Sequence, residues 1–364
     1  MAWRSCFVLF RLTAQDVLRS SPRGGSRWPH SFQQRYGFKK VARKPESKKV
    51  EEELAAEVAP PRRPPTPHPK ERPPTGPPDY ILRPLIFTVG FTGCSFGAAA
   101  IWQYESLKSR VQSYFDEVRV DWLEKVRPQK QLGLRKEINQ WWNSLSEGQK
   151  TVTGIIAANF LVFCCWRIPS MQRTMVRYFT SNPASQTPCA PMVLSAFSHY
   201  SFFHMATNMY VLWSFSSSAV SILGREQFMA VYLTGGVVAN FASYLARTAT
   251  GRFGPSLGAS GAIMAILALV CTKMPEAKMS VIFLPMLTFT AAHALMGIVA
   301  MDTAGLLFGW QFFDHAAHLG GVLFGVWYIM YGHECIWKNR ETFVKIWHEM
   351  RTGGGPGRGG ANGG

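Results

Sequence analysis

The sequence is short of charge, and above all of acidic charge. Only 17% of its 364 residues are charged, and 22 Asp and Glu stand against 39 Lys and Arg, a net charge of +17. Soluble domains average about 25% charged residues. Residues 152–332 hold twelve charged residues, whereas residues 1–150 hold 26 basic and 15 acidic ones. This distribution excludes a single soluble globular domain, and it argues against a nucleic-acid partner because the basic residues do not gather on one foldable face.

Patterns for a metal site or a disulfide framework are also lacking. The seven cysteines form no CxxC pair and no spaced ladder with histidine, so we expect no metal, no disulfide scaffold and no cofactor. The HExxH motif of zinc proteases is missing, because neither His333-Glu334 nor His348-Glu349 is followed by a second histidine at the required spacing. An aspartyl protease would need two aspartates inside apolar runs, whereas here both are expected to flank a connector, Asp302 and Asp314.

What is present begins with a biased amino terminus. Residues 1–44 carry ten Lys or Arg, interspersed serines and a single acid, Asp16. An Arg-rich, Ser-containing, acid-poor amphipathic start is typical of a mitochondrial transit peptide, which we assign to residues 1–45. The alternatives are a basic disordered tail and a secretory signal, whose short apolar stretch Arg11 would interrupt. Residues 46–79 are rich in Pro, Glu and Lys and are expected to form a disordered linker.

Seven apolar runs decide the expected fold class. A helix needs about 20 apolar residues to cross the bilayer core. The runs cover residues 84–104, 151–168, 203–223, 228–246, 258–272, 281–300 and 315–331. We therefore predict an all-α polytopic membrane helix bundle of one leading span plus six. Its parts are a leading span at 80–104, an amphipathic juxtamembrane connector at 105–150, a six-helix core at 151–332 and a polar, Gly-rich tail at 333–364.

Basic residues in the connectors indicate how the bundle is oriented. The connectors after the second and fourth runs lie on the same side as the basic amino terminus, and they contain Arg167, Arg173, Arg177, Arg247 and Arg252. Basic connectors tend to stay on the inner side of a membrane. For the mitochondrial inner membrane, this tendency places the N-terminus in the matrix and the C-terminus in the intermembrane space.

Polar side chains inside the apolar runs point to chemistry, because such groups are costly at membrane depth. Ser260 opens the fifth run and His318 lies near the start of the seventh. Glycines beside both would let two helix backbones approach closely; they are Gly258, Gly261, Gly321 and Gly325. Such packing would bring Ser260 within hydrogen-bond reach of His318, and a serine becomes a nucleophile only when a base takes its proton. Taken alone, the serine segment could be helix packing and the histidine a helix cap or part of a transport pathway.

The third run adds two hydrogen-bond donors, His204 and Asn208, four residues apart on one helix face. With the backbone at Gly258 and Ser260, these donors could hold the oxyanion of a tetrahedral intermediate. The plainer alternative is an interhelical hydrogen-bond pair. The conjunction of all three motifs in this order, each at the beginning of a run, favours catalysis.

The set HxxxN at 204–208, GASG at 258–261 and AHxxGxxxG at 317–325 resembles the rhomboid family of intramembrane serine proteases, over about residues 80–332. The resemblance implies a catalytic dyad of Ser260 and His318 without a third carboxylate, assisted at the oxyanion by His204 and Asn208. Bacterial relatives commonly carry an aromatic residue that stacks on the histidine, at the position of Met264 here. Trp166-Arg167 is similar to a bacterial loop motif, but its distance from His204 along the chain suggests coincidence.

The resemblance also implies partners. Substrates would be single-pass proteins of the mitochondrial inner membrane, cut in or near their transmembrane helix, with roles in quality control, membrane dynamics and cell-death signalling. Other partners would be the lipid bilayer and inner-membrane scaffold or protease proteins, with no nucleic acid. An inactive rhomboid-like membrane chaperone would be expected to lack Ser260 or His318, and a small-solute transporter would be expected to show internal repeats with broken helices, which the sequence does not contain.

Overall fold

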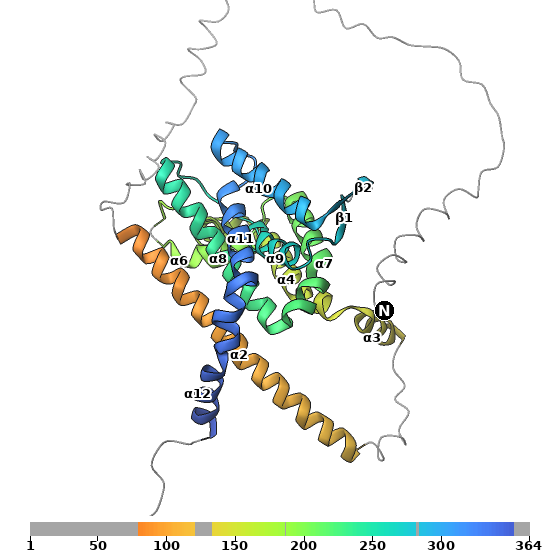
Figure 1. The fold of residues 1–364 in the computed structure, drawn as a ribbon. Coiled ribbons are helices and arrows are strands. Elements are labelled where there is room, and N and C mark those ends of the chain that lie inside the picture. Colours follow the sequence, from red (N-terminus) through yellow and green to blue (C-terminus); the bar gives the residue numbers. More distant parts are fainter. Residues whose placement is uncertain (1–78, 121–132, 186, 282–283, 353–364) are drawn as a thin grey trace, which may run out of the picture. The chain divides into compact units, whose positions relative to one another are not determined.

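The computed structural model describes residues 79–120, 133–185, 187–281 and 284–352, which are mainly helical (Figure 1). The transit peptide expected at 1–45, nearly all of the linker at 46–79 and the Gly-rich end lie outside the described residues and stay predictions. The expected helical membrane bundle is confirmed. Within the described ranges, four helices are long and apolar enough to cross a membrane: Ile81–Phe115, Glu147–Cys165, Arg225–Thr250 and Ala291–Phe308.

The leading helix is longer than the sequence suggests. Helix α2 runs over Asp79–Val120, 42 residues, which corresponds to about 63 Å against about 30 Å for the bilayer core. The short helix α3, Gly133–Ser144, buries none of its residues and exposes Trp141 and Trp142. The expected juxtamembrane connector therefore contains the end of α2 and an amphipathic helix whose apolar side chains are exposed.

Helix α4, Glu147–Cys165, begins where its sequence provides a cap. The Ser146 hydroxyl accepts the Gln149 backbone N–H at 3.1 Å, and the Gln149 side chain accepts the Ser146 N–H at 2.9 Å. This reciprocal pair satisfies two backbone donors that a helix start would leave open. Four short helices follow as a connector: η2 (Pro169–Met171), α5 (Gln172–Tyr178), α6 (Cys189–Leu194) and η3 (Ser195–Phe197).

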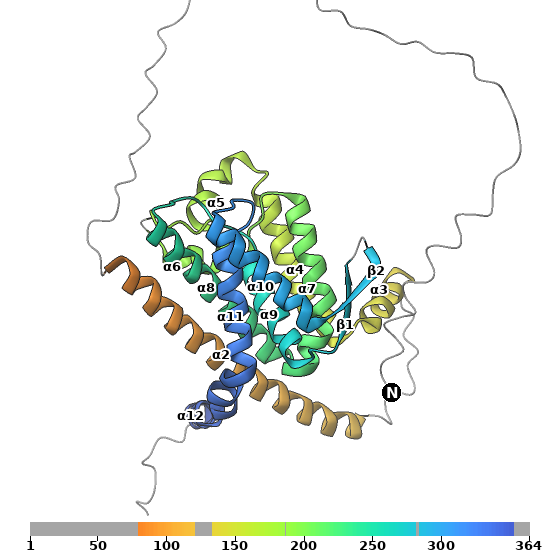
Figure 2. The ribbon, with the colours of Figure 1, turned by 45° about the horizontal axis from the view of Figure 1, so that its top comes forward.

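Two long helices and one short helix form the middle of the bundle. They are α7 (Phe202–Leu223), α8 (Arg225–Thr250) and α9 (Ser260–Lys273). Gly224 turns the chain between α7 and α8 with a φ of +79°, a conformation that favours glycine. Helix α9 contacts α7, α8, α10 and α11 (Figure 2). Ten of its 14 residues are buried, from Gly261 to Cys271, so α9 is the centre of the core.

The sixth expected span, at 281–300, is wrong in its first half. Strands β1 (Lys278–Val281) and β2 (Leu284–Thr290) pair antiparallel, with Lys278 opposite Thr290. Helix α10 covers Ala291–Phe308 and begins there because Thr290 caps it, accepting the His293 N–H at 3.4 Å. The helix therefore lies further along the chain than the apolar run, and Asp302 is inside it.

The end of the chain is more structured than the expected polar tail. The last four elements are α11 (His315–Trp327), the π-helix η4 (Tyr328–Trp337), η5 (Lys338–Arg340) and α12 (Glu341–Thr352). Helix α12 packs on α2, where Trp347 Nε1 donates to Glu105 at 3.1 Å and Arg351 pairs with the same carboxylate. Residues 333–352 are thus part of the folded unit.

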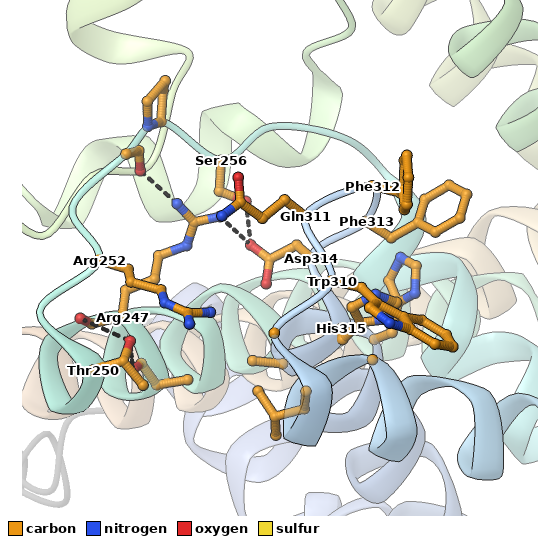
Figure 3. A pocket seen from close by; sticks show the side chains of 18 of the residues that line it. Arg247, Thr250, Arg252, Ser256, Trp310, Gln311, Phe312, Phe313, Asp314 and His315 are labelled. Atoms are coloured by element: carbon orange, nitrogen blue, oxygen red, sulfur yellow. Dashed lines mark hydrogen bonds and ion pairs between the residues drawn. The ribbon is translucent and has the colours of Figure 1, made fainter.

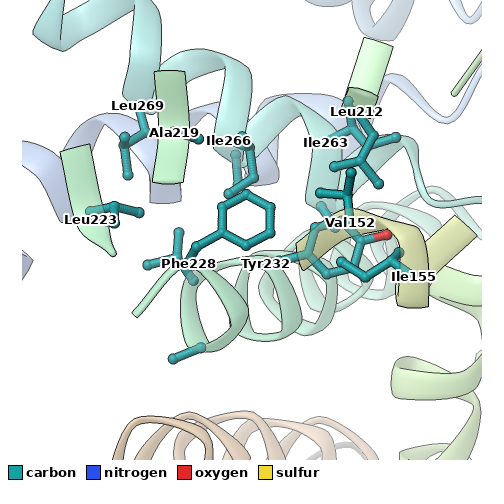
Figure 4. Packing of buried hydrophobic residues seen from close by; sticks show 14 of the residues in the cluster. Val152, Ile155, Leu212, Ala219, Leu223, Phe228, Tyr232, Ile263, Ile266 and Leu269 are labelled. Atoms are coloured by element: carbon teal, nitrogen blue, oxygen red, sulfur yellow. The ribbon is translucent and has the colours of Figure 1, made fainter. Parts of the chain in front are cut away.

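Close helix packing sets the core. Phe228 and Tyr232 of α8 stack at 6.3 Å and lie among apolar side chains of α9 such as Ile266 (Figure 4). Between α9 and α11 the backbones themselves are in contact. A Cβ added to Gly321 would lie 2.2 Å from the carbonyl oxygen of Gly261, and one added to Gly325 would lie 2.1 Å from that of Ala265. On its other side, Gly261 leaves room for Ala239 of α8, which an added Cβ would approach to 2.5 Å.

Candidate active site

Ser260 and His318 lie next to each other across the contact between α9 and α11. Ser260 is the first residue of α9, His318 lies in the first turn of α11, and Ser260 Oγ is 3.0 Å from His318 Nε2. A neutral imidazole accepts a proton at Nε2 only when its own proton is on Nδ1. The ability of His318 to act as a base therefore depends on what faces Nδ1.

The group that faces His318 Nδ1 is a carboxylate. Asp302 Oδ1 lies 3.1 Å from that nitrogen, and Asp302 is 0% exposed. The carboxylate accepts the Nδ1–H bond and leaves Nε2 toward Ser260. This corrects two expectations, that His318 lacks a third carboxylate partner and that Asp302 flanks a connector. Asp302 lies inside α10, because the helix continues for six residues beyond it before the connector begins.

A second histidine shares this carboxylate. His315 Nδ1 lies 2.7 Å from the same Oδ1, while Asp302 Oδ2 and His315 Nε2 are buried without a hydrogen-bond partner among the described residues. The aromatic neighbour of His318 is Phe313, at 6.1 Å between ring centroids, rather than a side chain at the position of Met264. The aromatic ring beside His318 therefore comes from the connector before α11.

The turn before Ser260 requires a glycine. Gly258 has a φ of +136°, and a Cβ there would lie 3.0 Å from Cε1 of His204. Its N–H donates to the carbonyl of Ser195 at 2.9 Å, so this N–H does not face the cavity as an oxyanion donor. No side chain among the described residues caps the start of α9. The first N–H groups of α9, at Ser260 and beyond, are thus left for another acceptor.

His204 and Asn208 have different surroundings. His204 lines the same cavity as Ser260 and His318. The Asn208 amide nitrogen lies 3.1 Å from the His204 carbonyl oxygen and 3.1 Å from His199 Nε2. Asn208 is therefore engaged by its neighbours and lies outside the cavity lining, contrary to the expectation of two donors aimed at one point.

His199 is a residue that the sequence analysis missed. It is fully buried, and its Nε2 accepts the Ala259 N–H at 3.4 Å as well as facing Asn208. Because both neighbours are donors, the ring proton belongs on Nδ1, which has no partner among the described residues. His199 thus connects α7 to the residue before Ser260. It lies five residues before His204, in a connector and outside every apolar run, where a search of the runs overlooks it.

Trp166 also lies closer to this region than its position in the chain suggests. Its Nε1 donates to Ser198 Oγ at 2.8 Å, its ring meets Tyr200 edge-on at 5.7 Å, and Arg167 donates to the Tyr200 carbonyl at 2.7 Å. These contacts give the pair a structural role, because the two residues fix the segment that carries His199.

A second carboxylate ties the two connectors of the site together. Asp314 Oδ2 accepts from Ser243 at 2.6 Å, Ser256 at 2.5 Å and Arg247 at 3.0 Å, as Figure 3 shows in part. Asp314 Oδ1 accepts the Ala317 N–H at 3.1 Å and so caps α11. Burial raises the pKa of Asp314, but Arg247 and the two hydroxyls lower the pKa by more than burial raises it. The pKa therefore lies below its usual value. The segment before Ser260 is thereby joined to the helix of His318.

The cavity over these groups has a volume of about 590 Å³ and is lined by Ser260, His204 and His318. Aromatic side chains of the connector before α11 lie at its border, with Phe312 87% exposed (Figure 3). Arg252 also lines it. Within the described ranges, no three His, Cys, Asp or Glu side chains are grouped so as to hold a metal ion.

Comparisons with known proteins show which family the chain is similar to. Residues 188–335 match the model of the Rhomboid domain. The chain is 64% identical over 342 residues to the human "Presenilin-associated rhomboid-like protein, mitochondrial", covering 93% of this chain and 89% of the relative. It is 55% identical to the zebrafish (Danio rerio) "Presenilin-associated rhomboid-like protein A, mitochondrial", over the whole of both chains. It is 34% identical to "Rhomboid protein 1, mitochondrial" of Saccharomyces cerevisiae over 52% of this chain and 55% of the relative.

Proposed function

The chain belongs to the rhomboid family, and we propose that it is an intramembrane serine endopeptidase. Family membership alone does not decide this, because one fold can host active and inactive members. The observation that carries the proposal is the 3.0 Å distance between Ser260 Oγ and His318 Nε2 beside a cavity. A nucleophile and a base within hydrogen-bond reach are what acyl transfer requires.

The proposed reaction has two steps. Ser260 Oγ attacks the carbonyl carbon of a substrate peptide bond while His318 Nε2 takes the hydroxyl proton. His318 then gives this proton to the departing amine as the C–N bond breaks, which leaves an acyl group on Ser260. A water, deprotonated by the same nitrogen, then attacks the ester. The bond between the acyl carbon and Ser260 Oγ breaks, His318 returns the proton to Oγ, and the acyl group leaves as a carboxylic acid.

The developing oxyanion needs donors placed in advance. The uncapped start of α9 supplies backbone N–H groups with the positive end of the helix dipole, beginning at Ser260. His204 lines the same cavity and is the proposed side-chain donor. Asn208 and Gly258 would support it less directly, Asn208 through the His204 carbonyl and Gly258 by leaving room for the His204 ring.

The length of α9 supports attack within the membrane. Its 14 residues correspond to about 21 Å, less than the roughly 30 Å bilayer core. A core helix of this length that reaches one surface begins below the other. Ser260 would then lie inside the hydrocarbon depth, where a substrate's transmembrane segment can reach it.

Location and partners follow from the relatives as part of the proposal. Their names place them in mitochondria, and we assign this chain to the inner membrane with its N-terminus in the matrix and its C-terminus in the intermembrane space. Single-pass membrane proteins would be the substrates, in quality control, membrane dynamics and cell-death signalling. The human and zebrafish names also describe an association with presenilin, and a membrane-protein partner of that kind is proposed here.

The test is cleavage of a tethered reporter span by the purified protein in liposomes. Wild type should cut the reporter, whereas Ser260→Ala and His318→Ala should not. Ser221→Ala is the matched control, because Ser221 is an exposed serine on α7 outside the lining of this cavity. A fluorophosphonate probe should label wild type and Ser221→Ala and spare Ser260→Ala. Equal cleavage by Ser260→Ala would refute the proposal, and reporter binding without cleavage by wild type would favour the inactive membrane chaperone.

A further inference from the structure

A buried carboxylate shared by two histidines lies behind the candidate nucleophile. Asp302 Oδ1 contacts His315 Nδ1 at 2.7 Å and His318 Nδ1 at 3.1 Å, and the three side chains are 0%, 4% and 7% exposed. Among the described residues, no Lys or Arg pairs with Asp302. Its charge is therefore compensated only by two imidazoles, groups that can gain and lose a proton near neutral pH.

The position of Asp302 on its helix is unusual. Helix α10 has 18 residues and buries only Ala291, Asp302 and Gly305. A helix that buries so few of its residues has no packing reason to bury a carboxylate, because burying a charge is costly unless it is paired. Only the contact with the two histidines accounts for this position in the described structure.

We infer that Asp302 is the positioning residue of His318 and that His315 in turn holds Asp302, an inference that rests on the proposed function. By accepting the Nδ1–H bond, Asp302 selects the tautomer whose Nε2 can take the Ser260 proton. Once His318 carries that proton, the carboxylate faces an imidazolium. Since no Lys or Arg in the described part of the chain neutralises Asp302, this attraction is stronger in the transition state than at rest.

His315 determines which way the carboxylate points. Asp302 Oδ2 has no partner in the described part of the chain, so the two histidines together hold Oδ1. The His315 ring lies against the backbone of α10 at Gly305, where a Cβ would come within 2.4 Å of Nε2. Gly305 is thus the space that lets His315 reach Asp302.

The titratable and charged groups around this cluster come from four elements. On α11 and its cap they are His315, His318 and Asp314; on α7, His204; and on α8 and the segment after it, Arg247 and Arg252. Among the residues that the structure describes, Asp302 is the only carboxylate that contacts His318. A change in the pH dependence of cleavage on replacing Asp302 therefore reports on this contact.

The first experiment replaces the charge and keeps the shape. Asp302→Asn should lower kcat by about 10² to 10⁴-fold, with KM changed less than about threefold. The acid limb of the kcat/KM profile should move to lower pH by about one unit, because the carboxylate no longer stabilises protonated His318. Asp314→Asn is the charge-matched comparison: Asp314 does not contact His318, and this variant should leave the acid limb in place.

The second experiment tests His315 without altering Asp302. Gly305→Ala should displace the His315 ring and lower kcat about tenfold or more, whereas Gly297→Ala on the same helix meets nothing within 4 Å and should behave as wild type. His315→Gln, which keeps a donor, should retain more activity than His315→Leu. Thermal unfolding of each variant in detergent shows whether it is folded.

The outcomes separate this inference from the proposed function. Wild-type kcat and an unshifted acid limb in Asp302→Asn would overturn the inference, even with Ser260→Ala inactive and the proposed function intact. Loss of the difference between wild type and Ser260→Ala would instead refute the proposed function itself. If Asp302→Asn does not fold, the Gly305→Ala and Gly297→Ala pair decides, and equal activity of those two overturns the inference.

Discussion

Two aspartates twelve residues apart in the chain both contact α11: Asp302, which is buried within α10, and Asp314, which is partly buried and caps α11. Asp314 contacts a guanidinium, two hydroxyls and the backbone N–H of Ala317. Asp302 has two imidazoles as its only hydrogen-bond partners in the described structure. The first carboxylate therefore has a permanent cation as partner, and the second has partners whose charge can change.

This difference gives the two carboxylates different roles, one in stability and one in turnover. Arg247 is charged at all accessible pH values, so its pair with Asp314 is the same before and during a reaction and contributes to the stability of the connectors. The interaction between Asp302 and His318 becomes stronger only when His318 gains a proton. We therefore expect substitutions at Asp314 to lower stability first and substitutions at Asp302 to lower turnover first.

The largest expected effect tests this division through His318. His318→Ala should reduce kcat by about 10⁴-fold or more. Adding Asp302→Asn to it should cost no further activity, because the positioning residue then has nothing to position. Adding Asp314→Asn should still lower the unfolding temperature. The comparison fails if Asp302→Asn lowers the residual cleavage of the His318→Ala variant as much as it lowers that of wild type.

A second effect separates the cation from the carboxylate in the Asp314 pair. Arg247→Met should destabilise the protein by about 2–3 kcal/mol, because it leaves the partly buried Asp314 carboxylate without its cation. Asp314→Asn should cost less, and the double variant less than the sum of the two. Unfolding in detergent, followed by circular dichroism, measures all three, and strict additivity would show that the pair is not coupled.

The pH dependence of stability sharpens the contrast further. The pKa of Asp314 lies below its usual value in the folded protein, so its contribution to stability is complete above about pH 4 and is lost as the pH falls through the folded-state pKa. Wild type should lose thermal stability more steeply than Asp314→Asn between about pH 4 and pH 2. Parallel curves for the two proteins would contradict this assignment.

The smallest effect concerns a single hydroxyl. Ser256→Ala removes one of the hydrogen bonds to Asp314 while Arg247 and Ser243 remain, so we expect a loss of about 1–2 kcal/mol in unfolding free energy. The acid limb of the cleavage profile should not move. A shift of that limb in Ser256→Ala would show that the Asp314 cluster acts on His318, and the two carboxylates would then not be separate.

Much of the organisation could be predicted from the sequence because it depends on composition and local pattern. Long apolar runs decide that helices lie in a membrane, and the helices α2, α4, α7, α8, α9 and α11 fall on six of the seven runs. Glycines at helical spacing indicated that α9 and α11 come close. The run at 281–300 misled because an apolar strand and an apolar helix have the same hydropathy, and a pairing partner, β1, decides between them.

The sequence by itself determined which residue types could react: a serine between glycines, a histidine in a second apolar run, and no motif for metal. Only the tertiary structure decided which polar groups surround them. His199 and Asp302 lie 61 and 42 residues from Ser260 in the chain, and no local pattern links them to it. Their contacts arise from the packing of α7, α10 and α11 around α9. A hydrogen bond depends on distances of about 3 Å in space, which hydropathy and spacing along the chain do not specify.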